Sequence, residues 1–298
     1  MEEFFQLVFA GIALGARYAL VALGFVVIYR ATGVINFAQG GLVALGAYAA
    51  YQFGQEWGLP FALAVLLALA ATGLVGVLIE RTVLRRMVGQ PVFAVIMITI
   101  GVLFVIEQAI PTIWGYGAKN LGDPWGVETV DAAGVGLAVR DLWTIGLAGL
   151  ALLGFFLFFR YSRLGLAMRA TAFDQEAALA QGISARQVFA LSWGIAGVVA
   201  ALAGVTLASG AAAVNPSISF IALAAFPAMI LGGLDSPGGA VIGGLIIGVT
   251  QTLTAGYQPE HAAFLGPNFH IVMPYVVMVI ILLVRPYGLF GTPEVERL

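Results

Sequence analysis

The chain has 298 residues, of which 61% are hydrophobic and 9% charged, and its mean hydropathy is +1.01. An average soluble domain is about 45–50% apolar and about a quarter charged, so the composition excludes an ordinary soluble protein and predicts a polytopic membrane protein. The net charge of −2 argues against nucleic acid as a partner. The chain has no cysteine and only two histidines, so we expect no metal and no cofactor.

A membrane helix needs about 20 apolar residues, and shorter apolar segments are tolerated where broken or re-entrant helices are buried in protein. The apolar segments therefore predict an all-α transmembrane bundle of about eight or nine spans. The segments are 5–28, 34–52, 60–79, 92–113, 142–159, 187–209, 219–233, 240–256 and 270–284. Glycine-rich breaks in 34–52 and 219–256 make these the candidates for re-entrant or broken helices. No other stretch is long enough to bury a core, which predicts one domain over 1–298.

Positive residues divide unevenly between the two sides of the predicted bundle. The poorer side has Lys119 and Arg140. The richer side has Arg30, Arg81, Arg85, Arg86, Arg160, Arg163, Arg169, Arg186, Arg285 and Arg297. Because positive loops are cytoplasmic, we predict an external N-terminus and a cytoplasmic C-terminus. The first residues, MEEFF, are acidic where a signal peptide is positive, so we expect the first span to be retained.

Residues 160–186 form a polar interruption that the positive-charge rule places in the cytoplasm. Thr171 begins a capping-box pattern, and Gly182 can end a helix in the left-handed conformation. Together they predict a short helix over 173–181. Ser184 begins a second capping-box pattern, which predicts the start of the next span.

The predicted outer loop, 115–141, carries four acidic residues. It is either a solvated loop or a docking surface for an extracytoplasmic protein. The acidic residues are Asp123, Glu128, Asp131 and Asp141.

Two glycine-rich breaks interrupt the apolar segments. In the first, the amides Asn36 and Gln39 precede Gly40 and Gly41, and unsatisfied amides in hydrocarbon cost several kcal/mol. The second, LGGLDSPGGAVIGG at 231–244, includes Gly232 and Gly233 and has the composition of a turn. Its PGGAVIGG echoes QGGLVALG at 39–46, and repeats with broken helices are common in transporters. Both breaks are explained either by helix packing or by a gate or translocation lining.

Two charged residues, Arg17 and Glu107, fall inside predicted spans. A charge at the bilayer centre costs roughly 2.5–3.5 kcal/mol on insertion scales, so each is expected to face the protein interior or a cavity. They could pair with each other as structural elements, or they could contact a substrate.

Several catalytic motifs are missing from the sequence. There is no GxxxxGK[ST] phosphate loop, no HExxH motif and no plausible Ser-His-Asp triad. The chain is therefore not expected to be an enzyme, and energy for transport must come from an ion gradient or from another subunit. Gradient-driven carriers usually have several intramembrane carboxylates, whereas this chain has only Glu107 in that position.

Six stretches in order resemble the permease subunits of the branched-chain amino acid ABC importers, a group that also includes amide and urea importers. They run from the first span to the C-terminus, and VINFAQG with the short N-terminus resembles the smaller of two paired permeases. Arg17 and Phe173 depart from the family pattern. The stretches are 18–24, 34–40, 46–48, 163–182, 232–234 with 237–244, and 285–291.

The resemblance implies a multi-pass protein of a prokaryotic inner membrane that works by alternating access. Its partners would be a second permease in a heterodimer, two cytoplasmic ATPases and an external solute-binding protein. Alternatives are import of amides or urea, a stand-alone gradient-driven carrier or channel, or an assembly subunit without a path. The residues that resemble the ATPase-coupling loop are Asp174, Glu176, Ala177, Ala178 and Gly182.

Overall fold

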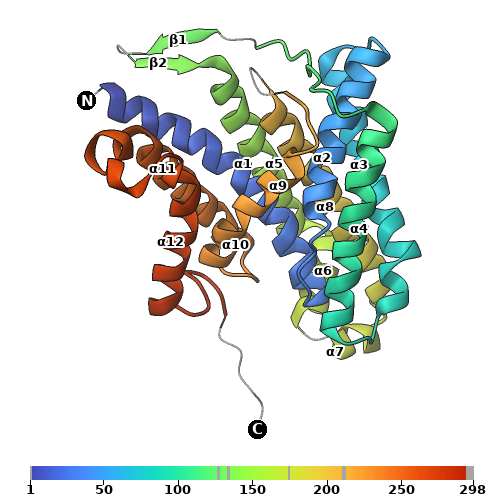
Figure 1. Cartoon of the computed structure of the whole chain (residues 1–298). Helices are drawn as coiled ribbons and strands as arrows, with labels where there is room; N and C mark the ends of the chain where they lie inside the picture. Colours follow the sequence, from blue (N-terminus) through green and yellow to red (C-terminus); the bar gives the residue numbers. More distant parts are fainter. Residues whose placement is uncertain (1, 126–127, 133–134, 174, 210–212, 293–298) are drawn as a thin grey trace.

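The computed structural model describes residues 2–125, 128–132, 135–173, 175–209 and 213–292, and most of these are helical (Figure 1). The described residues include six helices long and apolar enough to cross a membrane, which confirms the polytopic helical bundle. The second of them continues through a 3-10 turn to Met87. The six are α1 (Glu2–Thr32), α3 (Phe61–Thr82), α4 (Val92–Trp114), α5 (Val139–Tyr161), α8 (Ala185–Ala208) and α11 (Pro237–His261).

Shorter elements fill the spaces between these helices. The 3-10 turn Ala222–Ala225 joins α9 to α10, and the π-helical turn Gln52–Glu56 extends α2. The hairpin β1–β2 lies at one end of the bundle, and α7 lies at the other (Figure 1). The shorter elements are α2 (Gln39–Tyr51), β1 (Thr129–Ala132), β2 (Val135–Ala138), α6 (Arg163–Phe173), α7 (Gln175–Ala180), α9 (Ile218–Ile221), α10 (Phe226–Gly232) and α12 (Phe269–Val284).

Helices α1 and α8 form the centre of the bundle, since about four fifths of their most apolar stretches are buried. Glycines bring α1 against α11. A Cβ placed on Gly15 would lie 2.7 Å from the Cα of Leu245, and one on Gly248 would lie 2.2 Å from the nitrogen of Gly15. Small residues drive such close packing in membranes because apolar side chains gain little by leaving lipid.

Helix α2 packs against α8 in the same way. A Cβ on Gly46 would lie 2.2 Å from the Cα of Ala201, and one on Gly204 would lie 2.1 Å from the Val43 carbonyl oxygen. By contrast, less than a third of the apolar stretch of each of α3, α4 and α5 is buried. These three helices therefore offer their outer faces to lipid or to a partner.

The predicted span 34–52 is not one continuous helix. Helix α1 ends at Thr32, Gly33 adopts φ +70°, and the residues up to Ala38 are not helical. Helix α2 then begins at Gln39, whose side chain lies against Gly24 of α1. Gly24 lies eight residues before the end of α1, which corresponds to about 12 Å of helix. The chain therefore turns back along α1 before α2 begins, as a broken helix does.

The predicted outer loop 115–141 contains regular structure. Strands β1 and β2 pair antiparallel, with Thr129 opposite Ala138, and α5 already begins at Val139. Lys119 forms an isolated bridge with Val214, which ties the loop to the chain before α9. The loop is thus tied to the chain before α9 at Lys119 and folds back on itself in the hairpin.

The polar segment 160–186 holds two helices instead of the single predicted one. The prediction that Thr171 caps a helix is wrong, because Thr171 lies inside α6 and its hydroxyl donates to the Ala167 carbonyl at 2.9 Å. Phe173 ends α6, so it does not begin the short helix α7. Ser184 does precede α8 as predicted, although its side chain makes no capping hydrogen bond.

The predicted end of the short helix is confirmed. Gly182 adopts φ +82°, and its N–H donates to the Leu179 carbonyl at 2.9 Å. The next N–H, of Ile183, donates to the Ala178 carbonyl at 3.0 Å. This pair of bonds is the Schellman motif, which needs a left-handed residue at the position of Gly182.

Candidate functional site

The helix break between α1 and α2 buries both predicted amides. Asn36 is 1% exposed, and its Oδ1 accepts a hydrogen bond from the Ala38 N–H at 3.0 Å, which shapes the turn before α2. Gln39 is fully buried, and its Nε2 donates to the Ala196 carbonyl of α8 at 3.3 Å. Within the described residues, Asn36 Nδ2 and Gln39 Oε1 have no hydrogen-bond partner. Buried polar atoms are rarely unpaired, so the break retains unused hydrogen-bonding capacity.

Gly40 and Gly41 allow two other helices to approach the start of α2. A Cβ on Gly40 would lie 2.5 Å from the Ser219 carbonyl oxygen of α9, and one on Gly41 would lie 3.1 Å from the Ile106 Cβ of α4. The break is also bound to α4 directly, because the Phe37 N–H donates to the Thr99 hydroxyl at 3.2 Å. Helices α4, α8 and α9 therefore surround the amides.

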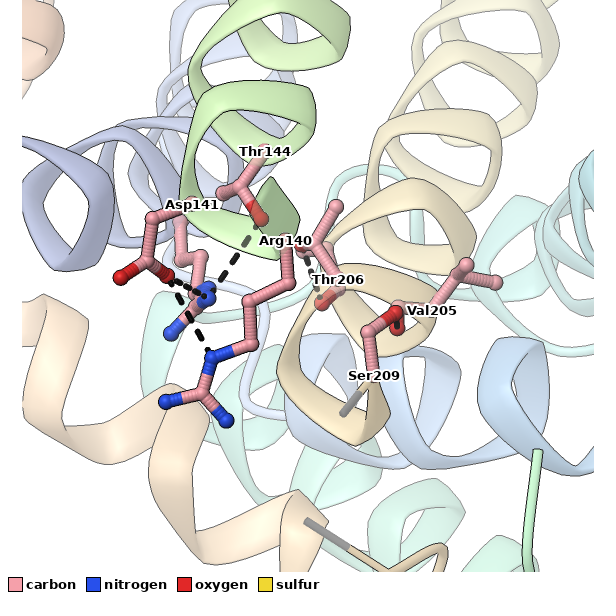
Figure 2. Close-up of polar contacts among 8 residues, drawn as sticks. Arg140, Asp141, Thr144, Val205, Thr206 and Ser209 are labelled. Carbon is pink, nitrogen blue, oxygen red and sulfur yellow. Dashed lines mark hydrogen bonds and ion pairs between the residues drawn. The ribbon is translucent and has the colours of Figure 1, made fainter. Parts of the chain in front are cut away.

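The two predicted intramembrane charges do not pair with each other, so that interpretation is wrong. Arg17 Nη2 lies 3.0 Å from Asp141 Oδ1 and 3.4 Å from the Thr144 hydroxyl. Arg140 Nε approaches the same carboxylate oxygen at 3.7 Å. Asp141 and Thr144 lie in the first turns of α5, with Arg140 beside them (Figure 2). Arg17 thus ties α1 to the start of α5.

Glu107 instead meets Ser219, whose hydroxyl lies 2.7 Å from its Oε1. Because the backbone of Ser219 contacts Gly40, the acidic side chain lies next to the start of α2. The structure therefore brings Glu107 together with the predicted path residues of the first glycine-rich break and leaves Arg17 outside that group.

Gly232 and Gly233 lie apart from the amides, at the other end of α10. A Cβ on Gly232 would lie 2.2 Å from the Gly239 carbonyl oxygen, so the glycine allows α10 to pack against the start of α11. Gly233 adopts φ +109° and contacts the backbone of Gly291. The N–H groups of Leu289 and Phe290 donate to the last carbonyls of α10 at 2.8 and 3.1 Å. We call residues 285–292 the C-terminal strap.

The predicted coupling residues are only partly exposed. Ala177 is exposed, whereas Ala178 is 4% exposed and packs inward, so the two alanines do not share one face. Asp174 and the side chain of Glu176 lie outside the described residues. Phe173, at the end of α6, is 94% exposed. It lines a cavity of about 700 Å³ together with Arg30, Arg169, Asp235 and others.

Other polar groups lie near the break, and sequence reasoning did not connect them with it. Glu80 is 2% exposed and accepts two hydrogen bonds from Arg85, at 2.7 and 3.2 Å. Glu80, Asn36 and Thr99 line a cavity of about 180 Å³ between the end of α1 and the start of α4. No signal in the sequence pointed to Thr99, because a single threonine in an apolar helix usually bonds its own backbone. Among the described residues, no cluster of three or more His, Asp or Glu could hold a metal ion.

A bundle of apolar helices around a broken helix with buried amides is an arrangement typical of membrane transport proteins. Residues 7–282 match the model of the family described as "Branched-chain amino acid transport system / permease component". The chain belongs to this family, which comprises transport permeases and not enzymes.

Curated relatives match over nearly their whole length. The chain is 32% identical to the high-affinity branched-chain amino acid transport system permease protein LivH of Escherichia coli K12, over 99% of this chain and 97% of the relative. It is 30% identical to BraD of Pseudomonas aeruginosa, a permease protein of the same description, over 99% of this chain and 98% of BraD. Among solved structures it is similar to PsaBC from Streptococcus pneumoniae in complex with Fab, with 15% identity, a TM-score of 0.47 and coverage of 91% and 89%.

Proposed function

We propose that this chain is the membrane-spanning permease subunit of an ATP-driven importer for branched-chain or related hydrophobic amino acids. The observation that carries the proposal is its likeness to LivH and BraD along the whole chain. In the proposed importer, separate partner subunits would hydrolyse ATP, and the absence of a GxxxxGK[ST] loop from the sequence supports this. The relatives do not favour the alternatives of amide or urea import, or of a stand-alone gradient-driven carrier.

The proposed assembly contains this permease, a second permease, two cytoplasmic ATPases and an extracytoplasmic binding protein. The arginine count supports an external N-terminus and a cytoplasmic C-terminus. With this orientation, α6 and α7 are on the cytoplasmic side and the β1–β2 hairpin is on the side of the binding protein, at opposite ends of the bundle (Figure 1).

We assign the translocation path or gate to the helix break. Asn36 and Gln39 each keep one buried polar atom without a partner in the described part of the chain, so a change in helix packing could offer these atoms to a solute. Gly40 and Gly41 allow α4 and α9 to close around this point. Gly232 and Gly233 belong to the opposite end of α10, where they would transmit movement and not contact the solute.

We assign ATPase coupling to the segment that runs from the end of α6 through α7 to Gly182. ATP-driven closure of the ATPase pair would push on α7, and the tilt of the attached helices would open the path alternately to the two sides. Exposed Phe173 and Ala177 would contact the ATPase, with the acidic residues Asp174 and Glu176 available for basic partners. The Schellman motif holds the end of α7 in a fixed direction before α8.

Replacement of Gly182 tests this assignment. A left-handed backbone costs a residue with a side chain about 1–2 kcal/mol, so Gly182→Ala should disturb the end of α7. Combined with Glu176→Gln, it should abolish ATP-dependent leucine uptake in proteoliposomes that contain the full complex. Gly89→Ala is the matched control, because Gly89 has φ +83° with open space around it in another cytoplasmic loop.

Normal uptake by the double variant, when it is inserted at the wild-type level, would overturn the coupling assignment. Uptake that needs an ion gradient and no ATPase would overturn the importer proposal itself. If Asn36→Ala and Gln39→Ala changed neither rate nor selectivity in an assembled complex, the chain would be an assembly subunit without a path.

A further inference from the structure

Glu107 is an acidic side chain at membrane depth that forms no ion pair with any described residue. It lies seven residues before Trp114, the last residue of α4, which corresponds to about 10 Å of helix. The Trp114 indole donates to Gln52 Oε1 at 2.6 Å, where α2 and α4 both end. Among the described residues, the ion pairs are Arg17–Asp141, Arg140–Asp141 and Arg85–Glu80, and none includes Glu107.

The contacts that Glu107 does make cannot balance a full negative charge. The Ser219 hydroxyl lies 2.7 Å from Glu107 Oε1, but it also lies 3.0 Å from the Pro216 carbonyl and has one proton to donate. An ionised carboxylate has about four acceptor positions. A charge left without a partner near the bilayer centre costs roughly 2.5–3.5 kcal/mol on insertion scales. In its ionised form Glu107 therefore needs a further donor or a cation.

The surroundings of Glu107 show from which side that cation comes. On the inner side, Ser219 is 3% exposed and contacts Gly40, so the space behind the carboxylate is filled by the start of α2. On the outer side, Glu107 is half-buried and the next residue, Gln108, is exposed. An acidic side chain turned to lipid without a partner is costly, so we infer that this side of Glu107 meets either a partner group or a water-filled path in the assembled protein.

We propose that Glu107 binds the α-ammonium group of the transported amino acid. The inference rests on the proposed function and deepens it by naming the chemical group that the permease recognises. An ammonium group carries one positive charge and three donors, and therefore supplies the charge and the donors that the carboxylate lacks. Phe104, one turn before Glu107, is 63% exposed and offers apolar surface to a hydrocarbon side chain. Amides and urea have no ammonium group, so Glu107 would favour amino acids over them.

The experiment measures binding of tritiated leucine to the assembled permease–ATPase complex in nanodiscs, without binding protein. Leucinamide keeps the ammonium group and should compete, whereas 4-methylpentanoate lacks it and should not. Glu107→Gln should weaken leucine binding by about tenfold or more, because a hydrogen bond to a charged group contributes about 1.5–3 kcal/mol. Glu107→Asp keeps the charge and should retain more binding than Glu107→Gln. Glu128→Gln, which neutralises an exposed acid outside the bundle, should have no effect.

Several results would overturn the proposal. The first is that Glu107→Gln binds leucine with an affinity within twofold of that of the wild type. The second is that leucinamide and 4-methylpentanoate compete equally well. The third is that the wild-type complex binds no leucine. Loss of the second permease from the Glu107→Gln complex, with retention by Glu107→Asp, would assign the missing cation to that subunit instead. If Glu107→Gln is not recovered from membranes, the wild-type complex decides, because equal competition by leucinamide and 4-methylpentanoate counts against the proposal. Failure of the proposed function is distinct, since it would appear as absence of ATP-dependent leucine uptake by the wild-type complex.

Discussion

The ion pair between Arg17 and Asp141 gives a quantitative test of how this bundle handles charge. Their side chains are 15% and 11% exposed and lie 3.0 Å apart. Removal of one partner from a buried ion pair lowers the free energy of unfolding by about 3–5 kcal/mol. We take about 3 kcal/mol for this pair, because both side chains are partly exposed. With about 2–4 °C per kcal/mol for a chain of roughly this size, Asp141→Asn should lower the melting temperature by about 6–12 °C. It also removes the carboxylate that both Arg17 and Arg140 approach.

The double variant Arg17→Met with Asp141→Leu should recover most of the loss, because apolar residues often replace a buried pair without cost. The assay heats the detergent-solubilised chain, fused to a fluorescent protein, and follows the folded fraction by size-exclusion chromatography. Glu128→Gln controls for the removal of an acidic charge from the same face. The reasoning is refuted if the melting temperature of Asp141→Asn lies within about 2 °C of that control. It is also refuted if the fall in melting temperature of the double variant equals the sum of the falls caused by Arg17→Met alone and Asp141→Leu alone.

Two further predictions concern glycines that hold the site. A Cβ on Gly24 would lie 2.0 Å from Gln39 Nε2, so Gly24→Ala should displace the amide and cut leucine uptake, at an overpacking cost of about 1–3 kcal/mol. Gly149→Ala is the control, because Gly149 lies in open space on α5, and it should take up leucine normally. Equal uptake by the Gly24→Ala and Gly149→Ala variants would contradict the assignment of the path to the helix break. Gly233→Ala should release the C-terminal strap, because φ is +109° and a Cβ would lie 2.4 Å from the nitrogen of Gly291. Limited proteolysis should then cut within 285–292 faster than in wild type or in Gly266→Ala, and unchanged cleavage would argue against it.

The parts of the fold that the sequence could predict are those with local causes. Long apolar runs define the helices, and Gly182 ends α7 because only its own backbone conformation is needed. The partner of Arg17 could not be found, since Asp141 is 124 residues away and falls within a loop by composition. Thr171 was misread because a threonine at a cap and a threonine bonded to its own helix backbone occur in similar local sequences.

The helix break was the harder part of the site to predict. The buried amides and the glycines after them marked the right place, but a span and a broken helix have similar apolar content. The turn at 33–38 depends on the contacts of Phe37 with Thr99 and of Gln39 with Ala196, which join segments 62 and 157 residues apart. Gly46 and Gly204 permit the packing that holds α2 against α8, yet 39 glycines in the chain hide which of them are needed for it.

The two groups of predicted path residues, although far apart, are joined by one short element. At the start of α10, the ring of Phe226 stacks 5.4 Å from that of Phe37 in the helix break and meets Phe25 of α1 edge-on at 4.8 Å. At its end, the strap binds the carbonyls of Leu231 and Gly232. Since α10 is only seven residues, or about 10 Å, long, we expect displacement of the strap to change the position of Phe226 against Phe37.

Thr292 of the strap bonds to Asp235, and both line the cavity that Phe173 and Arg169 of α6 share. We therefore expect a push on α6 at that cavity to reach the residues beside Asn36 through the packed groups of the strap and α10. This route needs no contact between Gly232 and the solute. The route explains why the end of α10 has glycines that no other residue can replace without strain, and why buried amides lie near its start.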